Sequence, residues 1–374
     1  MGLRLIPHTL HINFVGMRKI SYMVSLILLL AGAASLIIKG GPRYGIDFAG
    51  GAIVQVKFDT PVTEGDIKNA LGENNLPGLV VQSYGSGSDH AYLIRVSSPD
   101  QDLSAIRSKI ETAFKEKLPG SNVELQRTEF VGPKVGADLR SKAVEAMYFA
   151  TLLIAIYMSG RFEQRWLVAV IMAGALAGGM YLLELIGLGK AILVLAATLL
   201  TLVLCWKLRL IFALGAVACI LHDLLVTIGL FSIMDKEFDL TIIAALLTVI
   251  GYSLNDTIIV YDRIRENLHI MRGERLAVII NKSINQTLSR TVLTAGTTLL
   301  VVVALLVWGG GTIHDFSLVM FIGILIGTAS SIFVASPILL FFGDTVLRQA
   351  EAEERAKAEE EKKRRAAGKA TARA

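Results

Sequence analysis

Long apolar stretches alternate with short charged segments along most of the chain. A transmembrane helix needs ~20 consecutive apolar residues to cross the hydrocarbon core of a bilayer. Eight stretches meet or approach this length, and we expect each to form a membrane-spanning helix. They are residues 20–38, 143–159, 166–187, 191–206, 210–233, 240–261, 291–308 and 316–342. The pattern predicts a membrane α-helical bundle of about eight spans.

The first stretch, residues 20–38, has a position like that of a signal peptide. Its apolar run is too long for one, and no convincing cleavage site occurs in the following segment 39–42. We expect an uncleaved anchor helix after a short cytoplasmic N-terminal segment, residues 1–19.

One polar segment, residues 39–140, interrupts the apolar pattern. Its periodicity predicts the order strand, helix, strand, strand, helix, strand. The expected strands are 52–58, 79–84, 92–96 and 123–130, and the expected helices are 63–71 and 102–117. This is the order of ferredoxin-like α+β domains. We therefore expect an inserted ferredoxin-like domain with one small core of its own.

Composition agrees with a membrane protein. Apolar residues make up 53% of the 374 residues, charged residues make up 18%, and the mean hydropathy is +0.58. These values exclude an ordinary soluble protein, and two cysteines exclude a disulfide framework. No phosphate-binding loop is visible, so we expect no ATP use. Separately, we expect that the chain is not an enzyme and has no cofactor and no nucleic-acid partner.

The basic residues of the short loops predict the orientation, because cytoplasmic loops carry an excess of Lys and Arg. The expected external loops carry only Lys190 and Lys236. We therefore expect both termini in the cytoplasm, 39–140 in the periplasm, a transmembrane bundle over 141–343 and a charged tail over 344–374. The expected cytoplasmic basic residues include Arg4, Arg18, Lys19, Arg161, Arg165, Lys207, Arg209, Arg263, Arg265, Arg272, Arg275 and Lys282.

The stretch 240–261, an expected membrane helix, contains several polar residues. Thr248, Tyr252 and Asp256 are spaced by four and share one helix face, with Asn255 beside it. If Leu240 lies at the outer edge of the membrane, Asp256 lies ~24 Å along the helix axis. That depth is too great for a surface carboxylate.

A second polar stripe follows in the stretch 291–308. Arg290, Thr294, Thr297 and Thr298 lie on one face. Arg290 enters from the cytoplasmic side at a depth similar to that of Asp256. A contact between the two is plausible, although the sequence alone does not imply it.

A third polar pair, His222 and Asp223, lies near the middle of the stretch 210–233. Adjacent helical residues point ~100° apart, which makes them a poor metal pair, and no third ligand has suitable spacing. We therefore expect no metal site.

Single membrane threonines and asparagines usually form hydrogen bonds between helices, and an Asp–Arg pair can be static. Several acids and one Arg on neighbouring spans are harder to explain by packing alone, so we favour a proton relay. The residues expected in it are Asp256, Arg290, Asp223 and His222, with a supporting polar stripe of Asn255, Tyr252, Thr294, Thr297 and Thr298. Gly323, Gly327 and Ser331 form a row of small residues that predicts close helix packing.

Several motifs occur together in one order. They are GIDFAGG at 45–51, VGPKVG at 131–136, RFE at 161–163, HD at 222–223, GYSLNDT at 251–257, YDRIREN at 261–267 and NQTLSRT at 285–291. Over about residues 15–345 the chain resembles the SecF branch of the SecD/SecF family of protein-export membrane proteins, within the RND superfamily.

The resemblance implies a subunit of the bacterial inner membrane that acts with SecD beside the SecYEG channel. Such a subunit uses the proton motive force to promote late stages of polypeptide export. Further expected partners are YajC, YidC, the unfolded polypeptide substrate and membrane lipid. The resemblance also matches Asp256 and Arg290 to the family's proton path and adds Asp223 as a candidate.

A further family motif, at the base of the external domain, matches Asp47, Phe48, Gly50 and Gly51. Glycines there suit a tight turn where the chain leaves the bilayer. The chain departs from the six-span family pattern at about residues 166–207, which predict an extra helix pair. This pair either faces lipid or alters the docking of SecD.

Two other functions remain open from the sequence. One is an RND-type exporter of small molecules or lipids, which the small external domain and the half-transporter size disfavour. The other is an intramembrane aspartyl protease, which needs two facing carboxylates that share a proton. Asp223 and Asp256 are the only candidates for that pair that we identify, and neither has a supporting sequence context.

Overall fold

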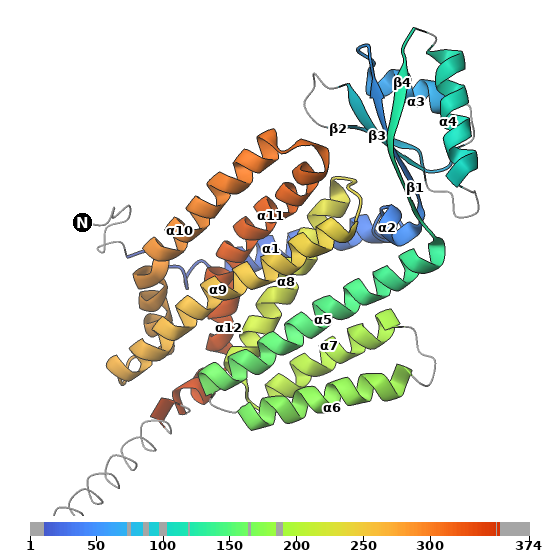
Figure 1. Cartoon of the computed structure of the whole chain (residues 1–374). Coiled ribbons are helices and arrows are strands. Elements are labelled where there is room, and N and C mark those ends of the chain that lie inside the picture. The colour runs from blue at the N-terminus through green and yellow to red at the C-terminus, as the bar shows by residue number, and fades with distance from the viewer. Residues whose placement is uncertain are drawn as a thin grey trace, which may run out of the picture.

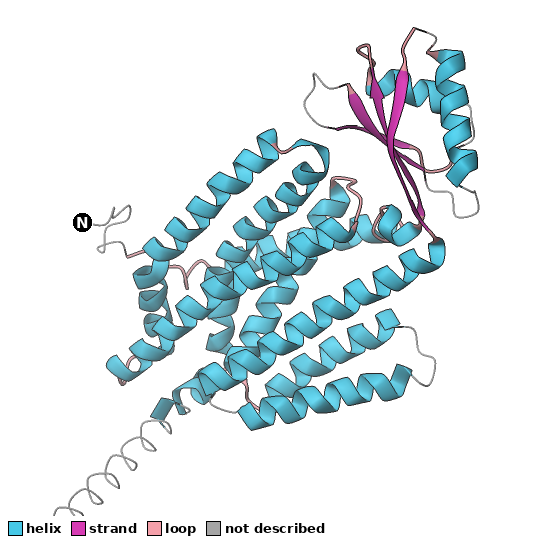
Figure 2. Cartoon of the chain, viewed as in Figure 1, coloured by secondary structure: helices cyan, strands magenta, loops and turns pink. Residues whose placement is uncertain are grey.

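The computed structural model describes residues 11–72, 76–84, 90–96, 103–118, 120–163, 166–184, 190–348 and 350–351. Long helices form one bundle, and a small domain of strands and helices lies at one end of it (Figures 1 and 2). The bundle helices are α1 (Arg18–Ile38), α5 (Pro133–Glu163), α6 (Trp166–Glu184), α7 (Lys190–Lys207), α8 (Ile211–Ile233), α9 (Leu240–Ile270), α10 (Leu276–Trp308), α11 (Gly310–Ser330) and α12 (Ser336–Phe341), with a π-helical turn, η1 (Ser331–Ala335), between the last two.

The small domain has the element order predicted from the sequence. It contains α2 (Ile46–Ala49), β1 (Gly51–Phe58), α3 (Glu64–Gly72), β2 (Val80–Tyr84), β3 (Ala91–Val96), α4 (Leu103–Lys117) and β4 (Val123–Val131). The four strands form an antiparallel sheet in the order β2-β3-β1-β4. The segment 85–89, between the second and third predicted strands, lies outside the described residues.

Alternation along β1 explains the core of this domain. Val54 and Val56 point to one face of the sheet and are fully buried. Ile106, Ile110 and Phe114 recur on one face of α4 and complete the same cluster. The domain therefore has a hydrophobic core separate from that of the bundle.

Six helices are long and apolar enough to cross a membrane among the described residues: α1, α5, α8, α9, α10 and the segment Ile313–Phe341. Helices α6 and α7 contain shorter apolar runs, Trp166–Gly179 and Ile192–Lys207. Several helices exceed the apolar stretches that predicted them: α5 begins at Pro133 and α10 at Leu276. The helical hydrogen-bond pattern continues into polar sequence that a hydropathy criterion does not count.

The expected last span, residues 316–342, is not one uninterrupted α-helix. Helix α11 passes into the π turn at Ser331, and Pro337 lies at the start of α12. Proline lacks the N–H that an uninterrupted helix would need, and the wider π turn allows the chain to continue in nearly the same direction.

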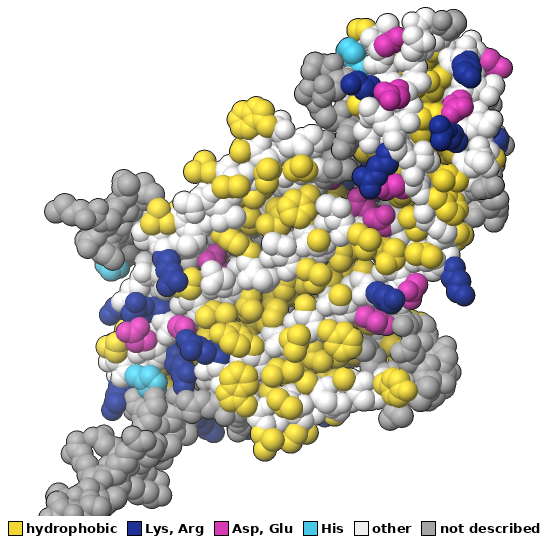
Figure 3. All heavy atoms as spheres, viewed as in Figure 1, with side chains coloured by type: hydrophobic (Ala, Val, Ile, Leu, Met, Phe, Trp, Pro, Cys, Tyr) yellow, Lys and Arg dark blue, Asp and Glu magenta, His cyan; other side chains and the backbone are white. Residues whose placement is uncertain are grey.

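The surface of the bundle has the distribution that a lipid environment requires. In the view of Figure 3, apolar side chains cover its middle, while Lys and Arg gather at the end away from the small domain. Helices α6 and α7 lie at the periphery beside α5 (Figure 1), and Leu167, Ile171, Ile192 and Leu195 on them are more than half exposed. A membrane-embedded helical protein is the direct interpretation.

Candidate functional site

Asp223 lies at the meeting point of three helices. It is on α8, and only 2% of its surface is exposed. Its Oδ2 accepts hydrogen bonds from Ser253 Oγ of α9 at 2.5 Å and from Ser330 Oγ of α11 at 2.8 Å. Burying a carboxyl group is costly unless it is hydrogen-bonded. The two serine hydroxyls therefore offset the cost of burying the Asp223 carboxyl group.

His222 contacts its neighbour in spite of the ~100° between adjacent helical residues. Its Nδ1 lies 2.9 Å from Asp223 Oδ1, and its Nε2 is buried without a hydrogen-bond partner. In this pair both carboxyl oxygens of Asp223 have hydrogen-bond partners, whereas Nε2 of His222 has none. This arrangement can hold or pass a proton.

Asp256 is the second buried acid, on α9, with 1% of its surface exposed. Among the described residues, Thr328 Oγ1 of α11 donates a long hydrogen bond to Asp256 Oδ2, at 3.4 Å. A carboxylate can accept several hydrogen bonds, so Asp256 is far less well satisfied than Asp223. Under-satisfied buried polar groups are candidates for a functional role.

Arg290, the predicted partner of Asp256, does not contact it. Arg290 is exposed on α10, and neither a hydrogen bond nor an ion pair within 4.0 Å joins these two described side chains. Asp256 instead faces Thr328 of α11. The contact that the sequence left plausible is therefore not made in this conformation.

Among the described residues, the supporting polar stripe forms no hydrogen-bonded network between helices. Thr294, Thr297 and Thr298 donate to carbonyls of their own helix, four residues earlier. The Tyr252 hydroxyl lies beside Thr294 and Thr298, although no hydrogen bond of normal geometry reaches it. Asn255 is exposed. The threonines are therefore explained by helix geometry alone.

Helix α11 brings the two acids into one structural unit, because Thr328 serves Asp256 and Ser330 serves Asp223. Sequence reasoning missed Ser253, Thr328 and Ser330 as acid partners. A partial signal was the row of Gly323, Gly327 and Ser331, which identified α11 as a closely packed helix.

The glycines of that row explain why α11 can approach α9. A Cβ at Gly327 would lie 2.9 Å from the Ser253 Cβ, and one at Gly323 would lie 2.3 Å from a Val249 methyl group. No side chain fits at either position without movement of α9. The absence of side chains thus places the hydroxyls of α11 within reach of both acids.

The π turn follows directly after Ser330. The Tyr261 hydroxyl of α9 donates to the Ala335 carbonyl at 2.9 Å, and Ser336 Oγ donates to the Ser331 carbonyl. Single π turns inside helices occur frequently at functional sites. Here the turn lies next to the acid partner Ser330.

The base motif lies where the small domain meets the bundle. Asp47 Oδ2 accepts a hydrogen bond from Leu240 N at the start of α9, and Phe48 is buried. Gly50 has φ of +79°, and its position against Pro133 leaves no room for a side chain. Gly51 also has a positive φ. The turn that the sequence predicts here is present.

A charged loop, Met234–Asp239, joins α8 to α9 and also contacts the small domain. We call it the junction loop. Glu237 pairs with Arg95 of β3 at 3.1 Å and with Arg43 at 3.4 Å. Lys236 pairs with Asp315 at the start of α11 at 2.7 Å. One loop therefore touches the small domain and connects the helices that carry the two acids.

Asp235 of the junction loop forms ion pairs with Lys39 and Arg43, both at 3.0 Å. The hydrogen bond and charge of Lys39, together with the charge of Arg43, hold the pKa of Asp235 below its usual value. The loop is therefore fixed to the end of α1 as well.

Two alternative chemistries find no support in the geometry. Among the described residues, no group of three His, Cys, Asp or Glu side chains could hold a metal ion. No hydrogen bond joins the carboxyl groups of Asp223 and Asp256, which have separate hydroxyl partners. A protease dyad would require the two acids to share a proton.

These features define a class: a polytopic membrane protein with a small α+β domain at one end of its helical bundle and buried acids inside the bundle. A family model described as "Protein export membrane protein SecD/SecF, C-terminal" matches residues 109–178 and 184–345, and the "SecD/SecF GG Motif" matches residues 35–62. The chain belongs to the SecD/SecF family of protein-export membrane proteins.

Relatives match along most of the chain. "Protein translocase subunit SecF" of Magnetococcus marinus is 41% identical over 346 residues, covering 92% of this chain and 96% of the relative. The SecF of Pseudomonas aeruginosa is 34% identical over 334 residues, covering 89% and 92%.

A solved structure has a similar fold. The crystal structure of SecDF, "a translocon-associated membrane protein" from Thermus thermophilus, is similar at a TM-score of 0.63 and 29% identity. The similarity covers 92% of this chain and 40% of the SecDF chain. This chain therefore spans about two fifths of that SecDF chain.

Proposed function

We propose that this chain is a SecF-type subunit that acts with SecD beside the SecYEG channel and uses the proton motive force to promote polypeptide export. Its relatives are named translocase subunits, and the SecDF structure is described as translocon-associated. YajC and YidC are further proposed partners. The alternative, an RND-type exporter of small molecules or lipids, is not favoured by these relatives.

The proposed architecture has eight spans, both termini in the cytoplasm and a periplasmic ferredoxin-like domain over 39–140. Helices α6 and α7 contain 19 and 18 residues. Such helices are ~27–29 Å long, close to the ~30 Å of the hydrocarbon core. Their exposed apolar side chains favour the lipid-facing interpretation of the extra pair. The other proposed regions are the cytoplasmic N-terminal segment 1–19, the first transmembrane helix 20–38, the transmembrane bundle 141–343 and the cytoplasmic tail 344–374.

The single observation that carries the mechanism is the arrangement of Asp223 and Asp256 on neighbouring helices, with hydrogen-bond partners on one shared helix, α11. An ionised Asp223 accepts from both Ser253 and Ser330. A proton on Oδ2 makes that oxygen a donor, so a serine hydroxyl has to turn, whereas a proton on Oδ1 is donated to His222 Nδ1 and removes the negative charge that both hydroxyls face. Proton uptake thereby changes the preferred packing of α8, α9 and α11.

Energy for this change comes from the membrane. One elementary charge that crosses ~100 mV releases ~2.3 kcal/mol, which is enough to bias a modest conformational equilibrium. In this scheme His222 delivers or accepts the proton at Asp223. Arg290 acts on Asp256 through its charge and not through an ion pair in this conformation.

The junction loop supplies the proposed route to the periplasmic domain. Its two ends continue into α8 and α9, and its Glu237 pairs with Arg95 of the domain. A shift of α8 against α9 therefore moves a loop that the domain is attached to. Movement of the domain is the step that would act on an emerging polypeptide.

The test is export into proteoliposomes that contain SecYEG, SecD and this chain, with and without an imposed proton gradient. We expect Asp256→Asn and Asp223→Asn to abolish the gradient-dependent part of export. Asp138→Asn is the control, because Asp138 is an exposed acid of α5 paired with Lys142. Full gradient-dependent export by Asp256→Asn would disprove its assignment to the relay.

A further inference from the structure

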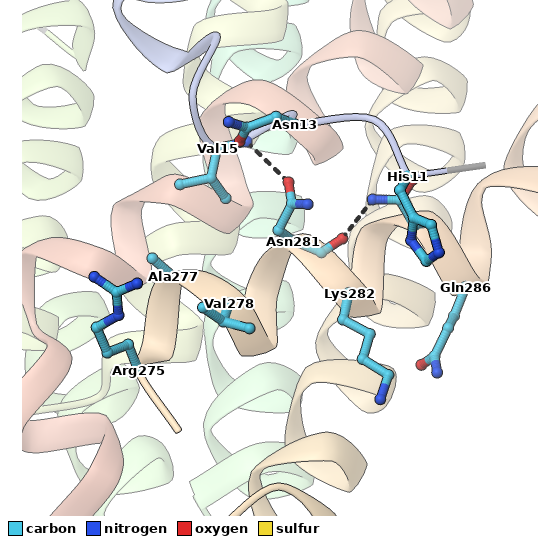
Figure 4. A pocket seen from close by; sticks show the side chains of 10 residues that line it. His11, Asn13, Val15, Arg275, Ala277, Val278, Asn281, Lys282 and Gln286 are labelled. Carbon is cyan, nitrogen blue, oxygen red and sulfur yellow. Dashed lines mark hydrogen bonds between the residues drawn. The ribbon is translucent and has the colours of Figure 1, made fainter. Parts of the chain in front are cut away.

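A cavity of about 660 Å³ lies at the end of the bundle away from the small domain. The segment His11–Val15 forms one side, and the first turns of α10 form the other (Figure 4). Its lining contains Arg275, Lys282 and His11 but no acidic residue. The cavity therefore has a positive electrostatic potential that nothing in its lining offsets.

The cavity has rigid walls. Asn285 Nδ2 donates to the Ile12 carbonyl at 2.9 Å, and Ile12 N donates back to Asn285 Oδ1 at 3.0 Å. Asn281 Oδ1 accepts from Val15 N at 3.2 Å, and Asn285 also donates to the Asn281 carbonyl (Figure 4). These bonds fix the N-terminal segment against α10 and maintain the space between them.

The side-chain amides of Asn281 and Asn285 hold the walls together, whereas the Arg275 and Lys282 side chains take no part in these hydrogen bonds. The structure shows no ion pair from Arg275 or Lys282 to any described acid, and both side chains are exposed. The sequence before His11 contains Arg4 and His8 but no Asp or Glu, so it brings no compensating negative charge. An anion from outside the chain would supply the compensating negative charge.

The depth of the cavity identifies the source of that anion. Trp308 at the opposite end of α10 is 80% exposed, as expected of an aromatic anchor at a membrane interface. Lys282 lies at most ~39 Å from it along the helix, and a bilayer with its headgroups is ~40–45 Å thick. Lys282 therefore lies at the level of the other headgroup layer. Val278, 37% exposed, adds apolar surface to the same cavity.

We propose that this cavity binds the headgroup of an anionic phospholipid, with Arg275 and Lys282 contacting its phosphate. Basic pockets at the cytoplasmic ends of membrane helices have the chemistry to bind such headgroups. The site is separate from the buried acids. It needs only the membrane embedding of α10, so it can fail or succeed independently of the proton relay.

The experiment measures lipid retention by the purified full-length chain in detergent, using native mass spectrometry. Phosphatidylglycerol is the anionic probe, and phosphatidylcholine is the matched neutral probe. We expect the chain to retain phosphatidylglycerol preferentially. Each of Arg275→Gln and Lys282→Gln should weaken its binding roughly fivefold, the usual contribution of one basic residue near an anionic lipid surface.

Controls separate this site from general attraction and from loss of folding. Lys207→Gln removes one charge from the exposed end of α7, outside the cavity, and should leave retention unchanged. The charge-preserving change Arg275→Lys should retain most of the binding. Equal retention of the two lipids, or an equal loss with Lys207→Gln, would overturn the proposal. Displacement of the lipid by an equal concentration of inorganic phosphate would overturn it too, because the site would then recognise free phosphate.

Discussion

At the level of single residues, the two buried acids differ in how well they are satisfied. Asp223 has two hydroxyl donors and an imidazole, whereas Asp256 has one long hydrogen bond from Thr328. A buried carboxyl group with all its hydrogen bonds formed is held firmly by its surroundings. The position of one with few hydrogen bonds depends more on whether the group is protonated. The sequence predicts both acids but not this difference.

Ser330→Ala tests the hydrogen bond that links α11 to Asp223. Loss of a donor to a buried carboxyl group should lower the free energy of unfolding by ~1–3 kcal/mol. Thermal unfolding of the purified chain in detergent measures the change. Ser317→Ala is the matched control, because Ser317 is also buried on α11 but its Oγ has no partner. Equal destabilisation by the two substitutions would contradict the role given to Ser330.

Asp235 provides a prediction about pH. Lys39 and Arg43 lower its pKa in the folded chain, so its ion pairs add stability above the usual carboxyl pKa. This contribution is lost as the pH falls through the lowered value, since the acid is then protonated in both states. The stability advantage of the wild type over Asp235→Asn should be constant near neutral pH and vanish in acid. An advantage that persists at the lowest pH would contradict this, and thermal unfolding across the pH range measures it.

At the level of elements, the closeness of α9 and α11 depends on glycine. Gly327→Ala places a Cβ 2.9 Å from that of Ser253, so the helices must separate. Overpacking of this kind costs ~1–3 kcal/mol. Gly296→Ala on α10 meets nothing within 4 Å, and the better helix propensity of alanine should leave it neutral or slightly stabilising. The midpoint temperature of thermal unfolding should therefore fall for Gly327→Ala and stay the same or rise slightly for Gly296→Ala.

Much of the element order could be predicted from the sequence, because helix and strand periods are local properties. The strands of the small domain, the long helices and the turn at Gly50 follow from spacing and from residue type. The contact of Asp256 with Arg290 is not made in this conformation because it depends on helix rotation. Periodicity places both residues on polar faces, but only packing decides that Asp256 faces α11.

The partners of the acids could not be found from the sequence for a related reason. Ser253, Thr328 and Ser330 are ordinary small polar residues in membrane helices, where they usually serve packing. Their role depends on which helix lies beside which. The junction loop was also missed, because its charges resemble those of any exposed loop until Arg95 and Glu237 are seen together.

For the molecule as a whole, the junction loop links the small domain to the bundle through the Arg95–Glu237 ion pair. The Arg95 and Glu237 side chains are 11% and 16% exposed, so their pair is screened less than a surface pair. A shift at the acids can reach the domain through this link. The remaining pairs, from Lys39 and Arg43 to Asp235, are exposed and contribute less.

Arg95→Gln should therefore loosen the domain from the bundle. We expect faster hydrogen exchange in β3 and the junction loop, together with a loss of stability below the ~3–5 kcal/mol of a fully buried pair. The control is Arg127→Gln, which removes an exposed pair with Glu129 inside the same domain. If both variants changed exchange in the junction loop equally, the link would not be specific.

The most direct test of the central claim is proton flux through proteoliposomes that contain this chain and SecD, followed with a pH-sensitive dye inside the vesicles. The account predicts flux down an imposed gradient in the wild type and in Asp138→Asn. It predicts that the flux is lost in Asp223→Asn and in Asp256→Asn. Undiminished flux in both of these variants would show that the buried acids do not carry the proton.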